Sequence, residues 1–193
     1  MSMKNFINLF FCNFLFKVSY IGLENLDKYD KYLICPNHSC IFDPFFIYPK
    51  TKNLHIMAKV ELFKYPILSS ILRHYNVFPV DRNKVDSKSL FQALSVFDSS
   101  ESKQLLIFPE GKVIKSDEEV RKKVRNGATF IAAKATVPIV PVYISRRPRF
   151  FSKVIVTFGA PIFISSYALE DKNYLKQCSK DLIDIIYSLN AQS

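Results

Sequence analysis

The sequence predicts a single α/β domain, with helices flanking a central mixed β-sheet. Short runs rich in β-branched and aromatic residues alternate along the chain with apolar residues at helical spacing, an order typical of α/β folds. A length of 193 residues suits one domain, and 49% hydrophobic residues provide a sizeable core. With only 4 glycines and 10 prolines, the composition excludes collagen-like and disordered chains.

Six strands are expected where short apolar runs are bounded by polar or turn-forming residues. They are Tyr32–Cys35, Leu54–Ala58, Val77–Val80, Leu105–Phe108, Ile139–Ile144 and Val154–Phe158. Four helices are expected between and after these strands, because apolar residues there recur at intervals of three and four. They run from Pro66 to Tyr75, from Asp86 or Ser87 to Phe97, from Gly127 to Ala135, and from Leu175 to Leu189. Proline suits the first turn of a helix, and Asp or Ser is a favourable N-cap.

The N-terminus carries a segment dense in Phe and Leu, Phe6–Phe16, which Asn8 and Asn13 interrupt and Lys17 follows. As a helix it rises about 16 Å, roughly half the thickness of the hydrocarbon core of a bilayer. No small-x-small cleavage site follows it, so it is not read as a signal peptide. We expect residues 1–22 to form a hydrophobic, membrane-associating helical segment and residues 23–193 to form the main domain. An ordinary core helix is the alternative.

The net charge of +10 is concentrated in one part of the chain. Between Lys112 and Arg149 ten basic residues face only three acidic ones. Such a patch favours an anionic partner, which could be nucleic acid, acidic lipid, a phosphorylated substrate or an acidic carrier protein. The alternative is a solvated basic surface that aids solubility.

The four cysteines include no CxxC pair, and a domain of this size does not need disulfides. A reducing, cytosolic environment is the simpler inference. The spacing of Cys35, His38 and Cys40 superficially resembles a metal cluster. Because no second group of ligands with zinc spacing exists in the sequence, no metal site is expected.

Reactive side chains follow the first predicted strand, at the kind of strand end where α/β folds place their sites. His38 and Asp43 stand five residues apart. If the chain turns between them and Asp43 enters a helix, the carboxylate keeps one ring nitrogen protonated and leaves the other as a general base. The same pair is compatible with a partly buried structural histidine. Ser39 and Cys40 are interpreted as spacers, because the chain has no GxSxG nucleophile elbow.

Three further blocks follow in order: Val80–Arg82 (VDR), Phe108–Gly111 (FPEG) and Val137–Val142 (VPIVPV). Together with Asn37–Asp43 (NHSCIFD), they resemble the four ordered blocks of the glycerolipid acyltransferase family, which includes the bacterial 1-acylglycerol-3-phosphate acyltransferases. A lone HxxxxD is a weak signal, whereas the four blocks in register are specific. The family's FPEG block continues Thr-Arg-Ser, but this chain reads Lys112-Val113-Ile114. This departure concerns the contacts with the headgroup and not the catalytic pair.

The resemblance implies that an acyl group passes from a thioester donor, on acyl carrier protein or coenzyme A, to the free hydroxyl of a lysoglycerolipid. The implied acceptor is 1-acyl-sn-glycerol-3-phosphate, which gives phosphatidic acid in phospholipid biosynthesis. His38 would act as the general base, and Asp43 would fix its tautomer. The expected substrate-binding residues are Arg82, Phe108, Pro109, Glu110, Gly111 and Lys112. Arg82 suits a phosphate, since guanidinium donates two parallel hydrogen bonds.

The same resemblance implies a peripheral or monotopic protein on the cytoplasmic face of the cell membrane, with no cofactor and no metal. Val137–Val142 is read either as the lining of an acyl channel or as a plain buried strand. One alternative function is acyl transfer to a different lyso-lipid. A catalytically silent membrane-binding protein and a nucleic-acid-binding domain are the others. The basic patch lacks a recognisable nucleic-acid docking motif, so no nucleic-acid partner is expected.

Overall fold

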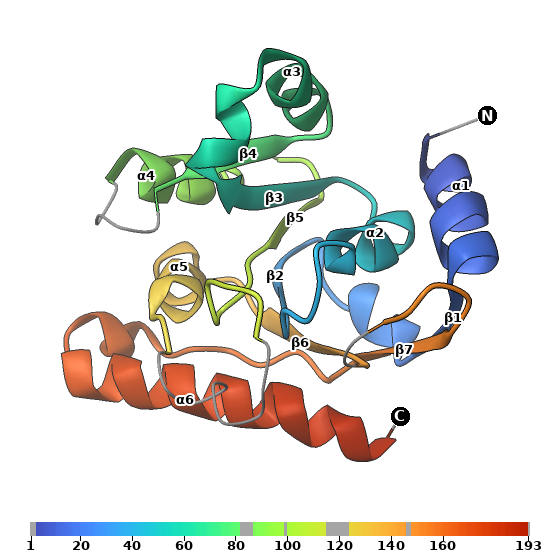
Figure 1. The fold of residues 1–193 in the computed structure, drawn as a ribbon. Coiled ribbons are helices and arrows are strands. Elements are labelled where there is room, and N and C mark those ends of the chain that lie inside the picture. The colour runs from blue at the N-terminus through green and yellow to red at the C-terminus, as the bar shows by residue number, and fades with distance from the viewer. Residues whose placement is uncertain (1–2, 82–86, 99, 115–123, 146–147, 193) are drawn as a thin grey trace.

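The computed structural model describes residues 3–81, 87–98, 100–114, 124–145 and 148–192, and it contains one mixed sheet between two layers of helices (Figure 1). The seven strands of the sheet are β1 (Lys17–Ile21), β2 (Lys31–Pro36), β3 (Leu54–Lys59), β4 (Val77–Val80), β5 (Lys103–Leu106), β6 (Ile139–Ile144) and β7 (Lys153–Phe158). Their order is β1-β7-β6-β2-β5-β3-β4. All neighbours are parallel except β6 and β7, which are antiparallel. The predicted α/β class and mixed sheet are confirmed.

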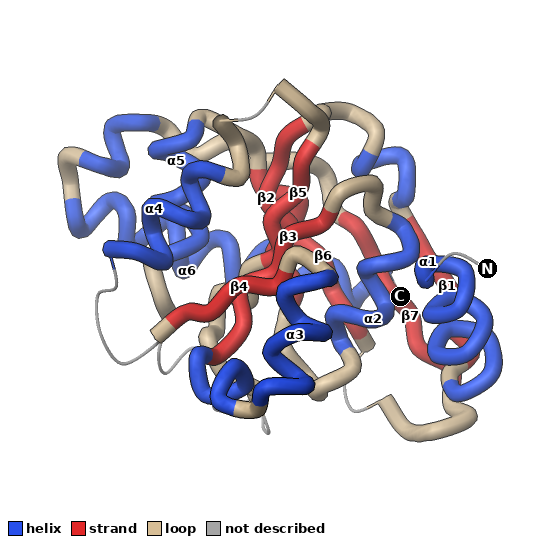
Figure 2. Tube along the Cα trace, turned by 90° about the horizontal axis from the view of Figure 1, so that it is seen from above, coloured by secondary structure: helices blue, strands red, loops and turns tan. Residues whose placement is uncertain are grey.

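The α-helices lie on the two faces of this sheet, as the view from above shows (Figure 2). They are α1 (Met3–Ile7), α2 (Asp43–Ile47), α3 (Pro66–His74), α4 (Ser87–Ser95), α5 (Gly127–Ala135) and α6 (Lys172–Ser188). A π-helical segment (Asn8–Leu15) continues α1, and 3₁₀ turns cover Leu23–Leu26, Tyr48–Lys50, Val60–Lys64, Ser166–Leu169 and Leu189–Gln192. One layer is formed by α4, α5 and α6, and the other by α1, α2 and α3.

Each layer encloses its own hydrophobic cluster, because successive side chains of a strand point to opposite faces. In β2, Leu33 and Cys35 pack toward α4, α5 and α6, whereas Ile34 packs toward the N-terminal segment and α2. Every residue of β6 is buried, and β2 is buried from Tyr32 onward. The two central strands therefore read as continuous apolar runs, as expected for parallel strands covered on both faces.

Among the strands, β1 and β5 depart most from the sequence-based expectation. The edge strand β1 was not predicted; its residues alternate between exposed and half-buried, and it pairs with β7. β5 begins at Lys103 and ends at Leu106, two residues earlier than predicted at each end. Ile107 still donates its N–H to the carbonyl of Ile34 (3.0 Å), and beyond it Phe108 leaves the sheet.

The N-terminal segment packs on the sheet with one side only. Ile7, Cys12 and Phe16 are buried, whereas the three phenylalanines Phe6, Phe10 and Phe14 are exposed. The apolar residues thus divide between a face that belongs to the core and a face that does not. Within the described part of the chain, no helix combines the length and apolar composition needed to cross a membrane. Five of the 22 residues assigned to this segment form β1 and are part of the sheet.

Candidate active site

The site begins where β2 ends, and Asn37 continues the sheet there with its side chain. The carbonyl oxygen Oδ1 accepts a hydrogen bond from Ile144 N–H (2.7 Å), and Nδ2 donates to Ile144 O (3.0 Å). The backbone N–H of Asn37 donates to Val142 O (3.3 Å). The buried amide therefore takes the place of a peptide group beside β6 and fixes the chain just before His38. Asn37 belongs to the first block, but its residue type and position gave no signal of this structural role.

His38 and Asp43 meet as predicted, with Nδ1 of the imidazole 2.9 Å from Oδ2 of the carboxylate. Asp43 is fully buried, whereas the His38 side chain keeps 12% of its surface exposed. Asp43 is the first residue of α2, so the predicted turn into a helix is present. When the carboxylate is ionised, Nδ1 carries the proton and Nε2 is the basic nitrogen.

Four further donors hold the Asp43 carboxylate, and all belong to Ser39 and Cys40. Their backbone N–H groups donate to Oδ2 at 2.7 and 2.9 Å, and Ser39 Oγ and Cys40 Sγ donate to Oδ1 at 3.1 Å each. Burial, together with the nearby Asp43, raises the pKa of the Cys40 thiol to about 12. These residues, predicted to be spacers, therefore fix the carboxylate.

The segment Phe108–Ile114 surrounds His38 on the other side. The Phe108 ring stacks on the imidazole with centroids 3.9 Å apart and an interplanar angle of 21°. Glu110 Oε2 accepts the backbone N–H of His38 (2.7 Å), and Ile114 N–H donates to the carbonyl of His38 (2.8 Å). The predicted FPEG block thus contacts the ring and the backbone N–H of His38, and Ile114, which follows the block, contacts the His38 carbonyl. The assignment of these residues to substrate binding stays a prediction.

Gly111 is needed because the side chain of Arg125 lies against it. The residue has a positive φ of 69°, and a Cβ built on it would lie 2.4 Å from Arg125 Nε. Only glycine accepts both the backbone conformation and this close approach. In the sequence Arg125 is one of the ten basic residues between Lys112 and Arg149, and no motif assigns it to the site. The structure brings its guanidinium next to the FPEG block, where Val113 replaces the arginine usual in the family.

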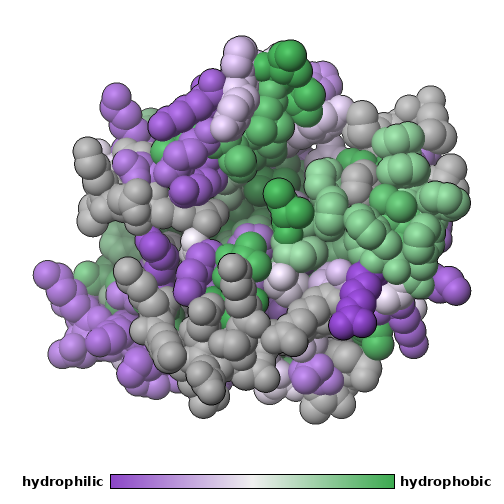
Figure 3. Space-filling model, in the orientation of Figure 1, coloured by the Kyte–Doolittle hydropathy of each residue, from purple (hydrophilic) through white to green (hydrophobic). Residues whose placement is uncertain are grey.

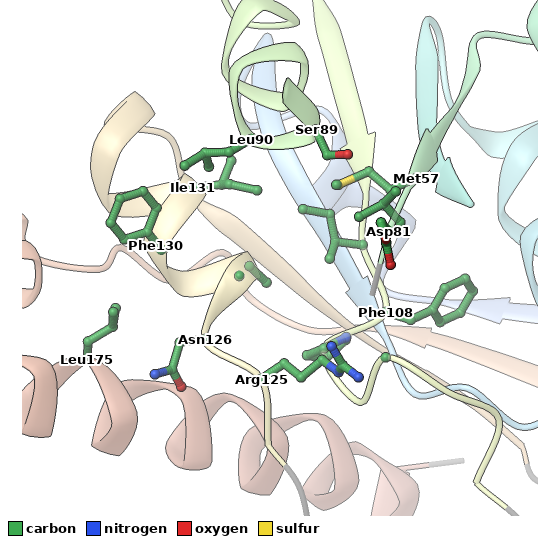
Figure 4. Close-up of a pocket in the computed structure, with 16 residues that line it drawn as sticks. Met57, Asp81, Ser89, Leu90, Phe108, Arg125, Asn126, Phe130, Ile131 and Leu175 are labelled. Atoms are coloured by element: carbon green, nitrogen blue, oxygen red, sulfur yellow. The ribbon is translucent and has the colours of Figure 1, made fainter. Parts of the chain in front are cut away.

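A pocket of about 520 Å³ lies next to this block (Figure 4). Its wall is mainly apolar, with Met57, Leu90, Ile107, Phe108, Phe130, Ile131 and Leu175, and its polar residues include Asp81, Ser89, Arg125 and Asn126. Phe130 and Leu175 lie at the end far from Phe108. Val137–Val142 contributes nothing to this wall. Its residues are buried and Ile139–Ile144 form β6, so this block is a buried strand of the sheet.

The remaining predicted substrate-binding residues lie in different settings. Pro109 is buried and lines the pocket, and Lys112 is exposed. Arg82 lies outside the described residues, as do Lys115, Arg121–Lys123, Arg146 and Arg147 of the basic stretch. Among the residues that the structure does describe, no three His, Cys, Asp or Glu side chains are grouped so as to hold a metal ion.

The comparison with known proteins agrees with this geometry. The family model named Acyltransferase matches residues 17–145, and the chain therefore belongs to this family. A protein from Borreliella burgdorferi named 1-acyl-sn-glycerol-3-phosphate acyltransferase is 29% identical over 86% of this chain and 66% of its own length. A protein of the same name from Bacillus subtilis is 33% identical over 46% of this chain and 42% of its own length. This chain thus matches less than two thirds of the length of either relative.

The fold is also similar to a solved structure. The crystal structure of the 1-acyl-sn-glycerophosphate (LPA) acyltransferase PlsC from Thermotoga maritima superposes with a TM-score of 0.65 at 23% identity. The match covers 96% of this chain and 78% of the other. At this identity the likeness concerns the fold, with its single α/β domain and central mixed sheet.

Proposed function

We propose that this chain transfers a fatty acyl group from a thioester donor to the free hydroxyl of a lysoglycerolipid. The observation that carries the proposal is the His38–Asp43 pair, 2.9 Å apart, with Phe108 lying between the imidazole and the apolar pocket. A base, a fixed tautomer and an adjoining apolar cavity are the parts this reaction needs. The family and the names of the relatives favour 1-acyl-sn-glycerol-3-phosphate as acceptor and phosphatidic acid as product.

The mechanism follows from the arrangement of His38. Nε2 removes the proton of the acceptor hydroxyl as its oxygen attacks the thioester carbonyl, a step for which general base catalysis typically contributes about 10²–10⁴ in rate. Asp43 stabilises the imidazolium that forms. The tetrahedral intermediate then collapses, the C–S bond breaks, and the imidazolium returns the proton to the leaving thiolate. The products are an ester and a free thiol, with no acyl-enzyme, since Ser39 and Cys40 donate to Asp43.

The pocket is assigned to the acyl chain. Its volume of about 520 Å³ falls in the range of small-molecule sites, and such sites are mostly apolar with a few polar groups that fix orientation. Phe108 belongs both to the pocket wall and to the stack on His38. A chain lying between Phe108 and Phe130 would therefore end close to the catalytic base.

The anionic part of the substrates is assigned to basic residues near the FPEG block. Arg125 contributes a guanidinium to the pocket wall next to Gly111, and Lys112 follows at the surface. Arg82 remains the predicted phosphate ligand from the second block. A guanidinium suits a phosphate because its fork of N–H donors matches two oxygens. The carrier of the thioester, acyl carrier protein or coenzyme A, is anionic in both cases.

A membrane surface is the proposed place of action, on the cytoplasmic face of the cell membrane. Phe6, Phe10 and Phe14 form an exposed row with ring centroids 5.5 and 6.0 Å apart, and Phe151 packs edge-on against Phe14. The apolar surface on this side of the molecule is visible beside α1 (Figure 3). The exposed Lys17 and Lys153 are register partners in β1 and β7, and two adjacent cations suit anionic headgroups.

An acceptor screen tests the function. The purified chain is incubated with lysophospholipids of different headgroups and with either an acyl-CoA or an acyl carrier protein donor, and products are identified by mass spectrometry. We expect phosphatidic acid from 1-acyl-sn-glycerol-3-phosphate, and no product with His38→Ala. If the chain prefers a different lyso-lipid, the proposed reaction class stands and only the proposed acceptor changes. Wild-type turnover by a folded His38→Ala protein would exclude the mechanism.

A further inference from the structure

The carboxylate of Glu110 joins the catalytic loop to the last helix of the chain. Oε2 accepts the backbone N–H of His38 at 2.7 Å, and Oε1 accepts the hydroxyl of Tyr187 at 2.5 Å. Glu110 is only 3% exposed. Both of its oxygens are therefore bound by the protein itself, although Glu110 is one of the expected substrate-binding residues.

Tyr187 is held firmly enough to fix this carboxylate. It lies near the end of α6, whose neighbouring residues Ile183 and Ile186 are buried against the sheet. Its ring packs edge-on against Tyr143 of β6, with centroids 5.9 Å apart. A packed phenol has few rotamers to choose from, so its hydroxyl keeps one direction.

The position of the His38 backbone decides where the imidazole points. The ring must satisfy Asp43 through Nδ1 and stack on Phe108 at the same time. A hydrogen bond between a charged carboxylate and a backbone N–H is stronger than a neutral one, and a buried carboxylate that loses a donor is costly. Removing the Tyr187 hydroxyl therefore frees Glu110 to shift, and His38 shifts with it.

We propose that Tyr187 is a positioning residue for the catalytic base, because its hydroxyl holds the Glu110 carboxylate that fixes the His38 backbone. This inference rests on the proposed acyltransferase function for its kinetic consequences only. It assigns to α6 a part in the site, although the helix follows all four sequence blocks. Glu110 accordingly acts through His38 and not by direct contact with the acceptor.

The first test is Tyr187→Phe, which removes one oxygen and keeps the ring. We expect kcat to fall roughly tenfold, the loss of one hydrogen bond to a charged group, with KM within about twofold of wild type. Tyr174→Phe on the same helix is the matched control, because Tyr174 is exposed and lies near Tyr167, not near Glu110. It should keep wild-type kinetics. A wild-type kcat in folded Tyr187→Phe would overturn the proposal.

A double-mutant cycle separates this role from a general loss of packing. In Glu110→Gln one acceptor oxygen is replaced by an NH₂ donor, so the side chain can no longer accept from both the His38 N–H and the Tyr187 hydroxyl. If Tyr187 acts through Glu110, adding Tyr187→Phe to this variant lowers kcat much less than it does in the wild type. Full additivity of the two losses would show that Tyr187 acts by another route.

A third experiment, by NMR, does not depend on enzymatic turnover. The chain has only three histidines, His38, His55 and His74, so ring resonances can be followed by NMR. In Tyr187→Phe the His38 ring resonances should shift, whereas those of His55 and His74 should not. If the wild-type protein transferred no acyl group, the proposed function would fail, and the His38 shift would still decide the inference. Unchanged His38 resonances would refute it.

Discussion

The Asp43 carboxylate lies 2.9 Å from Nδ1 of His38 and has no exposed surface. Four further donors to this carboxylate belong to Ser39 and Cys40, within four residues along the chain. The spacing of the HxxxxD motif is thus the length of a closed loop that wraps its own carboxylate. This explains why a short motif can specify a catalytic pair.

Replacing Asp43 with Asn should remove most of the activity. The amide offers one oxygen to five donors, and its NH₂ group can present a hydrogen to Nδ1, which favours the wrong tautomer of His38. We expect kcat to fall at least about 100-fold, and the protein to lose stability because buried N–H groups are left without an acceptor. Steady-state kinetics and thermal unfolding measure the two effects. A folded Asp43→Asn protein with near-normal kcat would contradict the pairing.

Asn37→Ala should destabilise the fold. The substitution leaves the N–H and C=O of Ile144 without partners at a buried position, at a cost of about 1–3 kcal/mol for each unsatisfied group. Denaturant unfolding should therefore show a lower midpoint and an unchanged slope. Asn173→Ala, at an exposed position of α6, is the control and should change the free energy of unfolding by less than about 0.5 kcal/mol. Equal stability of both variants would argue against this role of Asn37.

The six predicted strands and the His38–Asp43 pair could be predicted because their signals are local. Val77–Val80 and Ile139–Ile144 have the bounds that the apolar runs predict. β1 was missed because it has only five residues and directly follows Phe6–Phe16, so it was included in the N-terminal hydrophobic segment. Phe108 was assigned to a strand because an apolar residue after Leu105–Ile107 reads as a continuation, while its actual partner is the His38 ring.

The contacts that support the site could not be predicted from the sequence, for a different reason. Tyr187 and Arg125 reach Glu110 and Gly111 only after the chain has folded, and neither stands in a motif with a fixed spacing. The replacement of the family arginine by Val113 was the one available signal that another cation was needed. It did not indicate which one.

Cys40 should resist alkylation although it stands inside the catalytic loop. Burial is the main cause that raises the pKa of its thiol to about 12, and the thiolate is the reactive form. Because the thiolate forms only as pH rises toward that pKa, iodoacetamide should label Cys40 negligibly at pH 7–8 and increasingly above about pH 10. Mass spectrometry of the digested native protein reads this out. Rapid labelling at pH 7 would show that the thiol is not held as described.

The exposed phenylalanine row should decide membrane attachment. Each Phe that moves from water into an apolar phase gains about 1.5–3 kcal/mol, so the triple variant Phe6→Ser, Phe10→Ser, Phe14→Ser should lose binding to vesicles with anionic lipid. Phe91→Ser on α4 is the matched control, because Phe91 is 74% exposed but lies elsewhere. It should float with vesicles as the wild type does. Equal flotation of the triple variant would place attachment on another surface.

Arg125 should carry phosphate recognition together with Arg82. Its guanidinium lines the pocket beside the block that has lost the usual arginine, and a charged hydrogen-bonded contact contributes about 1.5–3 kcal/mol. Arg125→Ala should therefore lower kcat/KM for lysophosphatidic acid about 10- to 150-fold. Arg125→Lys keeps the charge but loses the bidentate geometry, so its loss should be smaller and mainly in KM. The same comparison at Arg82 shows how the two arginines share the phosphate.

Gly111→Ala tests the geometry behind this assignment. A methyl group on Gly111 would meet the Arg125 side chain at 2.4 Å. Gly111→Ala should thus displace Arg125 and lower kcat/KM. The same variants are measured with acceptors that carry or lack a terminal phosphate monoester. Arg125→Ala should lower kcat/KM only for the acceptor that carries the phosphate. If both acceptors are used equally well and neither arginine variant alters the ratio, the phosphate assignment is wrong and a lyso-lipid without the monoester becomes the acceptor.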